Sequence, residues 1–253
     1  MKQILFLLFM AAAITATSQK TDLVTVNTVK PKKGQKMAFE AAYKTHVAKF
    51  HKADEKISVY EIITGPNAGS YHLVNSGRSY ADFDKERPDK AAHDGDLDKT
   101  FFPLLDETNN ATYRFMDTLS LHADVQAESY VITVNHLKLG LDAAEYRTEL
   151  RRNVRIFEMQ NTPFAKNLSI SFFEQLWDGS DQVTVSIRNL KDGFKSLEAD
   201  YYGANPPGSP TFRELYEKTY GAAAWDARVK LLDGAIVKTE VALVKLRKDL
   251  SSQ

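Results

Sequence analysis

An internal repeat constrains this chain more than any other feature. The stretch "VTVNTVKPKKG" at 24–34 is matched by "ITVNHLKLGLD" at 132–142. Three more pairs of segments match in the same order, the last in pattern only: 57–65 with 168–176, 71–83 with 182–194, and 113–122 with 238–247. Because four ordered matches are hard to obtain by chance, we predict two copies of one module, at 21–124 and 128–250.

Strand and helix periods alternate within each copy. Val24 and Val26 alternate with polar residues, which predicts a strand, and Phe39, Tyr43 and Val47 then recur at helical spacing. In the second copy, Asp142 before Glu145 and Thr211 before Glu214 have the spacing of capping boxes, which predicts helix starts there. Two more strands, a second helical region and a closing strand complete each copy.

The order of predicted elements indicates the fold class, which is α+β. The order β-α-β-β-α-β, found twice, is the split βαβ or ferredoxin-like arrangement. Its sheet carries two helices on one face, and the other face also needs a cover. We therefore expect the two tandem modules to pack sheet against sheet as one intramolecular barrel. The chain would then be a monomer with a pseudo-dimeric barrel.

The first residues have the three parts of a secretory signal peptide. A basic residue, Lys2, precedes an apolar run at 4–14, and the small residues Ala16 and Ser18 follow at the −3 and −1 positions for cleavage before Gln19. The run is too short to span a bilayer comfortably. We therefore expect a signal peptide at 1–18 and an exported protein, periplasmic or extracellular. The alternative is a buried N-terminal helix.

Composition narrows the classes of partner. The chain has no cysteine, which excludes disulfides, thiolate metal sites and cysteine nucleophiles. Its 33 basic and 33 acidic residues leave no broad basic field for nucleic acid. There is no Gly-rich phosphate loop and no nucleophile elbow. We therefore expect no nucleic-acid partner, and the short apolar run predicts no membrane span.

The strand-to-helix passage "VNTVKPKKGQ" and the element order resemble the dimeric α+β barrel superfamily, in its antibiotic-biosynthesis-monooxygenase-like branch. The resemblance covers nearly the whole chain after the N-terminal segment, as a tandem duplication. It implies a small cavity between helices and sheet or between the two sheets. Members include haem-degrading monooxygenases and quinol-forming oxygenases, so the resemblance does not imply one reaction.

A sharper resemblance concerns the haem-degrading branch. Asn27 in "VNTVKPKKG" and His93 in "KAAHDG" fall on that branch's Asn and haem-ligand positions, and Phe83 stands where it has Trp. Phe83 can press a ring against a macrocycle but lacks the indole N–H, which weakens the case for ring cleavage. The second copy keeps Asn135 and Phe194, but no His follows. The resemblance therefore makes haem a possible cofactor without establishing one, and if haem binds, it allows at most one site, with His93 as the axial ligand.

Three polar side chains are further candidates for a ligand site. Asn27 and Asn135 lie opposite Val26 and Val134, on the face that we expect to be the barrel interior. They would be polar groups in a cavity or, alternatively, bond to a neighbouring strand, since a buried amide needs partners. Glu174 lies on a predicted strand, where an inward carboxylate would be a candidate general base. Its alternatives are solvent or a pair with Arg188 or Arg78.

The histidines give no spacing typical of a metal site. His46 lies on the apolar stripe of the first helix, so we expect it in the core. His46 and His51 are five residues apart, which should point them to different faces. No pair has the i,i+4 spacing with a Glu that a zinc hydrolase needs. We therefore predict no metal site apart from a possible haem iron on His93.

Three functions remain open. The leading one is binding of a small apolar or aromatic ligand in a barrel cavity. The second is haem binding or cofactor-poor monooxygenation with Asn27, Phe83 and His93, and the third is a structural or interaction module of the cell envelope. A cavity of roughly 300 Å³ near Asn27, lined by aromatic residues, would favour a ligand. An exposed apolar rim at Phe101, Phe102 and Leu105 would support further association.

Overall fold

The computed structural model describes residues 23–52, 55–138, 140–177, 182–198 and 201–252. The predicted signal peptide at 1–18 lies outside these residues, so processing and export stay predictions. None of the helices in the described ranges has both the length and the apolar character needed to cross a bilayer.

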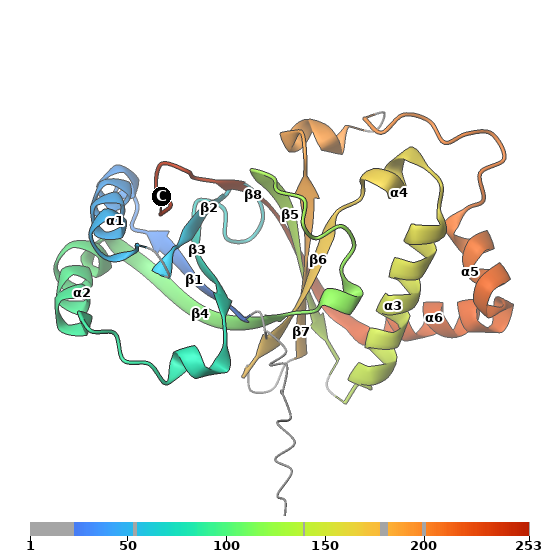
Figure 1. The fold of residues 1–253 in the computed structure, drawn as a ribbon, viewed down its shortest axis with the longest axis horizontal. Helices are drawn as coiled ribbons and strands as arrows, with labels where there is room; N and C mark the ends of the chain where they lie inside the picture. Colours follow the sequence, from blue (N-terminus) through green and yellow to red (C-terminus); the bar gives the residue numbers. More distant parts are fainter. Residues whose placement is uncertain (1–22, 53–54, 139, 178–181, 199–200, 253) are drawn as a thin grey trace, which may run out of the picture.

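Eight strands form one closed barrel at the centre of the molecule (Figure 1). They are β1 (Leu23–Pro31), β2 (Ser58–Ile62), β3 (Tyr71–Arg78), β4 (Leu105–Phe115), β5 (Ser129–Leu137), β6 (Ile170–Leu176), β7 (Gln182–Leu190) and β8 (Ile236–Leu246). Their order around the barrel is β1-β3-β2-β8-β5-β7-β6-β4, and all neighbours are antiparallel. The predicted α+β class and barrel are confirmed at this level.

Each half of the chain contributes four strands with the same connections. β1 lies between β3 and β4, and β5 lies between β7 and β8. Two junctions join the halves: β2 pairs with β8, where Tyr60 faces Leu246, and β4 pairs with β6, where Thr112 faces Leu176. The barrel therefore needs both halves. That the halves are copies of one module remains a prediction.

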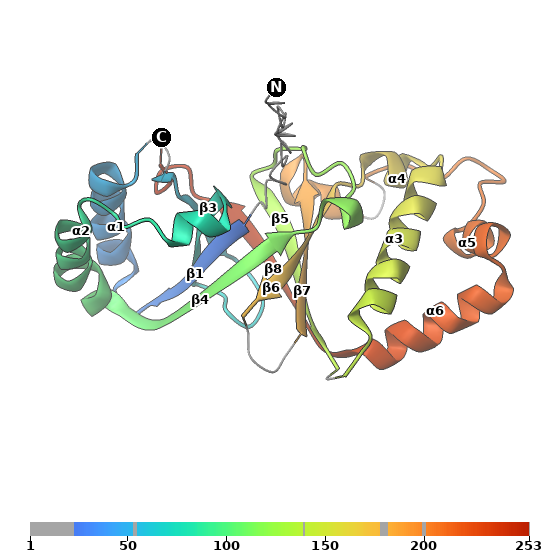
Figure 2. The same ribbon diagram turned by 60° about the horizontal axis from the view of Figure 1, so that its bottom comes forward.

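The helices cover the outside of the barrel on two opposite sides (Figures 1 and 2). The first half carries α1 (Lys36–Phe50) and α2 (Lys90–Asp96), and the second half carries α3 (Ala143–Met159), α4 (Pro163–Asn167), α5 (Phe212–Tyr220) and α6 (Ala222–Ala235). The predicted helix starts are confirmed. Asp142 accepts from the N–H groups of Ala144 and Glu145, and Thr211 and Glu214 form both bonds of a capping box.

Helix α1 attaches to the sheet through its predicted apolar stripe. Its buried residues pack on outward-facing residues of β1, β2 and β3; this cluster includes Val29, Phe39, Tyr43, Val47, Val59, Tyr71, Leu73, Phe101 and Leu105. Burying each large apolar side chain stabilises the fold by about 1.5–3 kcal/mol. Of the predicted apolar rim, Phe101 and Leu105 are core residues, and Phe102 alone is half-exposed. The three residues therefore form no continuous exposed surface.

The two faces of β1 are assigned opposite to our prediction. Val24 and Val26 line the barrel lumen together with Val134 of β5, whereas Asn27 and Val29 line a cavity beneath α1. The expectation that Asn27 and Asn135 point into the barrel was therefore wrong. The predicted alternation along the strands is correct. The aliphatic face of β1 and of β5 points into the lumen, and the face that carries both polar and apolar residues points toward the helices.

Candidate functional site

A cavity of about 300 Å³ lies between α1, α2 and the outer face of the first-half sheet. We call it the α1 cavity. Its wall is mainly apolar and includes aromatic rings; it is lined by Val29, Tyr43, Ile57, Leu73, Leu97, Phe101 and Phe102, with polar groups from Asn27, His46, His51, His93 and 108–110. The cavity has the size, the position beside Asn27 and the aromatic lining that favour a ligand over a filled structural module.

Two other cavities differ from it in chemistry. The barrel lumen encloses about 270 Å³ and is lined by aliphatic side chains with Tyr60, Tyr113, Tyr130 and His72. A smaller space of about 100 Å³ lies beneath α3 and contains Glu174. Only the α1 cavity, among these three, gathers several imidazoles on one wall. It is therefore the candidate functional site.

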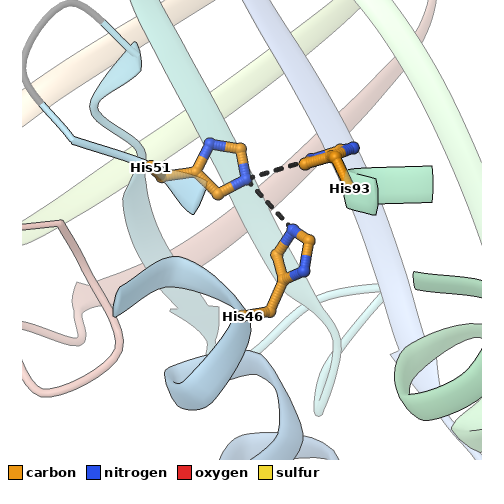
Figure 3. Close-up of side chains that lie close together, drawn as sticks. All are labelled: His46, His51 and His93. Carbon is orange, nitrogen blue, oxygen red and sulfur yellow. Dashed lines mark hydrogen bonds between the residues drawn. The ribbon is translucent and has the colours of Figure 1, made fainter. Parts of the chain in front are cut away.

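Three histidines meet at this cavity (Figure 3). We call His46, His51 and His93 the histidine cluster. The Nε2 atom of His51 lies 3.2 Å from that of His46 and 3.4 Å from that of His93. One ring nitrogen from each residue lies within 4.8 Å of the others, so the three nitrogens converge on one point.

The cluster corrects our prediction that His46 and His51 point to different faces. That argument holds inside a helix, but α1 ends at Phe50. His51 has left the helix, with φ −110° and ψ 81°, so its ring turns back toward His46. His93 arrives from α2, far along the chain. The helix end was the one signal that could have predicted this, because a five-residue spacing sets the relative direction of two side chains only when both lie in the same helix.

Each histidine also has an outer partner on Nδ1. His46 bonds a carboxylate oxygen of Asp96 at 2.8 Å, and His51 bonds the backbone carbonyl of Glu55 at 3.3 Å. His93 bonds a carboxylate oxygen of Asp94 at 3.0 Å. Carbonyl and ionised carboxylate oxygens only accept hydrogen bonds, so these partners place the ring proton on Nδ1. A neutral imidazole of this tautomer presents Nε2 as a lone pair.

Burial keeps the two inner histidines neutral. Desolvation, with smaller contributions from the neighbouring His46, His93 and Arg87, lowers the pKa of His51 to about 4. Desolvation also lowers the pKa of His46, although its hydrogen bond to Asp96 opposes this shift. The guanidinium of Arg87 is paired with the carboxylates of Glu55 and Asp89. Near neutral pH, His46 and His51 are therefore uncharged.

The three residues of the haem hypothesis are not all brought together. Asn27 and His93 line the α1 cavity, but Phe83 does not. Phe83 is 45% exposed, its ring lies edge-on to Trp177 with centroids 5.8 Å apart, and the guanidinium of Arg78 lies 5.5 Å from it. The ring that was expected to press on a macrocycle therefore belongs to a different surface.

Haem itself fits this arrangement poorly. An axial ligand presents one imidazole nitrogen to an iron that already carries a flat macrocycle. Here Nε2 of His51 lies 3.4 Å from Nε2 of His93, so a second ring stands where the macrocycle would lie. Three convergent nitrogens match a bare ion better than a haem iron.

The two asparagines bond to neighbouring strands, which was the alternative interpretation. Asn27 Oδ1 accepts from Asn110 on β4 at 2.6 Å, and Asn135 Oδ1 accepts from Thr239 on β8 at 2.9 Å. These partners are also the register partners of the two residues. Asn27 combines this structural bond with a place on the cavity wall, while Asn135 lines none of the three cavities.

The remaining second-half candidates do not form a free catalytic group. Phe194 is partly buried in the turn Gly193–Leu197 and lines none of the three cavities. Glu174 lines the small cavity beneath α3, where Arg114 and Arg147 bind its two oxygens at 2.5 and 2.8 Å. These arginines, rather than Arg188 or Arg78, are its partners. Both carboxylate oxygens are therefore already occupied.

Comparison with known proteins identifies the fold. Neither protein-family models nor curated proteins match this chain. Solved structures do, over nearly all of it. A candidate monooxygenase from Lactobacillus acidophilus NCFM is 8% identical with a TM-score of 0.51, over 92% of this chain and 96% of that one. An anthrone oxidase-like protein is 13% identical with a TM-score of 0.51, over 90% and 92%.

A candidate chlorite dismutase is 12% identical with a TM-score of 0.50, over 90% of this chain and 96% of that one. At these identities the likeness concerns the fold alone. The chain therefore shares the α+β barrel architecture of monooxygenase-like and chlorite dismutase-like proteins. The predicted α+β barrel is confirmed at the level of fold, whereas the resemblance to the dimeric α+β barrel superfamily stays a prediction.

Proposed function

We propose that this protein binds a small, largely apolar or aromatic molecule in the α1 cavity. The observation that carries the proposal is a space of about 300 Å³ beside Asn27 whose wall is mainly apolar. Ligand pockets typically begin near this size, about 300 Å³, and combine an apolar wall with a few polar groups that orient the ligand. Imidazole and amide groups can take a polar substituent, while Tyr43 and Phe101 contact a ring.

We further propose that 21–124 and 128–250 are copies of one module, of which only the first keeps a ligand site of this kind. The repeated strand connections and the matched sequence segments support a duplication. The chain would also be exported after removal of 1–18, as its N-terminal sequence indicates. The ligand would then be a molecule met outside the cytoplasm.

The proposal is tested by blocking the cavity. Ligand-observed NMR would measure binding of a panel of phenols and naphthols to the wild type, to Asn27→Phe and to Asn135→Phe. The two asparagines occupy matching, half-buried positions with a cross-strand bond, so the second variant controls for the loss of that bond. We expect saturable binding that weakens by about tenfold or more in Asn27→Phe only.

Equal binding by both variants would move the ligand to another cavity, such as the barrel lumen. No binding to the wild type by any member of the panel would favour the structural or interaction module instead.

The haem alternative makes a separate prediction. A haemin titration followed by visible absorption should give a saturable Soret shift in the wild type that is lost in His93→Ala. His122→Ala is the control, because His122 bonds the carbonyl of Leu168 outside the cluster. The crowding of His93 by His51 argues against this result. Absence of a Soret shift in the wild type, or an equal shift in the wild type and in His93→Ala, would reject haem binding through His93.

A further inference from the structure

The histidine cluster directs three ring nitrogens toward one another. The Nδ1 protons of His46, His51 and His93 are all directed to outer acceptors. In the neutral rings, the Nε2 atoms therefore face one another as acceptors at 3.2 and 3.4 Å. Acceptors this close repel each other unless a cation lies between them. A positively charged or proton-donating occupant would relieve this repulsion.

Two of the three nitrogen–nitrogen separations in the cluster, 3.2 and 3.4 Å, match those around a metal ion, and His46 and His93 would draw together around it. A tetrahedral ion with metal–nitrogen bonds of about 2.0–2.1 Å places neighbouring ligands about 3.3 Å apart. Metal-ligating histidines also donate their second N–H to a carboxylate or a backbone carbonyl, which fixes the tautomer. Asp96, Asp94 and the carbonyl of Glu55 occupy these outer positions. The cluster thus has both the inner and the outer contacts of a metal site.

We propose that His46, His51 and His93 bind a divalent transition-metal ion, of which zinc is the representative. Imidazole ligands suit zinc, copper, iron and nickel, whereas calcium and magnesium prefer oxygen. Three protein ligands leave one position of a tetrahedral ion open, as in catalytic rather than structural zinc sites. Because all three histidines line the α1 cavity, this open position faces it.

The ion would also define the ligand class of the cavity. An anionic oxygen, such as a phenolate or a carboxylate, would complete the coordination sphere while the ring of the ligand contacts the apolar wall. This extension rests on the proposed function, whereas ion binding by the cluster does not. Water is the rival occupant, and it has only two protons for three acceptors.

The first experiment measures metal binding by the whole protein after treatment with a chelator. Cobalt is titrated while visible absorption is recorded, because tetrahedral cobalt gives an intense spectrum, and zinc is then added to displace it. We expect one equivalent of cobalt with a tetrahedral spectrum, displaced by one equivalent of zinc. No stoichiometric binding to the wild type would overturn the proposal.

Variants then assign the ligands. His93→Gln removes a ligand and should weaken cobalt binding by more than the roughly 10–100-fold that loss of an outer partner costs. Asp96→Asn changes an outer partner and should weaken it within that range. His122→Gln should bind like the wild type. Far-UV circular dichroism confirms that each variant is folded, and unchanged binding by folded His93→Gln would also overturn the proposal.

A second titration separates ion binding from ligand binding. A phenol that binds the α1 cavity should perturb the cobalt spectrum and bind more tightly to the zinc-loaded protein than to the metal-free protein. Equal phenol affinity with and without zinc would leave the proposed ligand function standing and reject the coordinated ligand. Metal binding without any phenol binding would leave the metal site standing and reject the aromatic ligand.

Discussion

At the scale of single residues, His72 predicts a dependence of stability on pH. Burial in the barrel wall lowers its pKa to about 4, and its Nδ1 lies 2.9 Å from Thr28 Oγ1. An unfolded histidine titrates near about 6.5. Its contribution to stability is therefore complete above pH 6.5, falls as the unfolded state takes up a proton between pH 6.5 and about 4, and is constant below that.

Urea unfolding at pH 7.5, 5.5 and 4.5 would measure this effect in the wild type and in His72→Gln. We expect the stability advantage of the wild type to shrink by on the order of 2 kcal/mol across this range. The variant lacks this titration but keeps those of the histidine cluster, so the difference isolates His72. A difference that stays constant with pH would show that His72 is not held neutral.

The histidines and asparagines also show why the direction in which a side chain points was predicted poorly from the sequence. Alternation along β1 places Asn27 and Val26 on opposite faces, but both faces of this strand are covered, one by helices and one by the rest of the barrel. The pattern alone cannot say which cover lies on which face. The prediction for His51 was wrong for another reason. The direction of a side chain just past a helix end depends on the local φ and ψ, which residue spacing does not encode.

At the scale of elements, capping patterns predicted most helix starts, and the period of apolar residues predicted the order of the strands along the chain. Capping by Asp142 and by Thr211 with Glu214 depends on neighbours within three residues, so the sequence suffices. The second helical region of the first half is less regular than predicted. A short turn at Tyr80–Phe83 is followed by α2, and Pro88 between them disfavours a helical conformation in the residue before it.

Glycines in the β2–β3 hairpin provide a test of the junction between the halves. Gly65 and Gly69 both have positive φ, at 95° and 84°. A Cβ on Gly65 would lie 2.5 Å from the carbonyl oxygen of Val241 on β8, whereas one on Gly69 would meet nothing within 4 Å. Alanine at either position strains the backbone by about 1–2 kcal/mol, but only Gly65→Ala also pushes β2 away from β8.

Chemical denaturation of the two variants would separate these effects. Gly69→Ala measures the backbone strain, and we expect Gly65→Ala to lose a further 1–3 kcal/mol or so of unfolding free energy. Equal losses of unfolding free energy in the two variants would mean that the junction between β2 and β8 accommodates the added methyl group without destabilisation.

At the scale of the whole molecule, the barrel predicts one cooperative unfolding unit. Trp177 lies beside Phe83 and Tyr80 of the first half, whereas Trp225 lies in α6 against Phe212 and Tyr216. Since neither half completes its sheet alone, both tryptophans should report the same transition. In Trp177→Phe and in Trp225→Phe, the fluorescence and far-UV circular dichroism midpoints in urea should coincide.

A fluorescence transition of Trp225 at lower urea than the circular dichroism transition would show that the outer helices α5 and α6 unfold separately. The sequence anticipated the barrel because the repeat supplied two sheets in need of covers. The resemblance implied a cavity between the helices and the sheet or between the two sheets, but it could not decide between these places, since cavity volume depends on how side chains from eight strands meet.

The pairing of β8 has a consequence for the order of events in time. β8 closes the barrel by pairing with β2, near the other end of the chain, and the terminal Ser251 and Ser252 bond the backbone N–H groups of Val59 and Ile57. In a chain synthesised from its N-terminus, β2 therefore gains its second neighbour only once β8 has been made. Until then that strand is an open edge, the kind of surface that recruits other chains. Synthesis of β8, rather than formation of the first half, therefore covers this edge of β2.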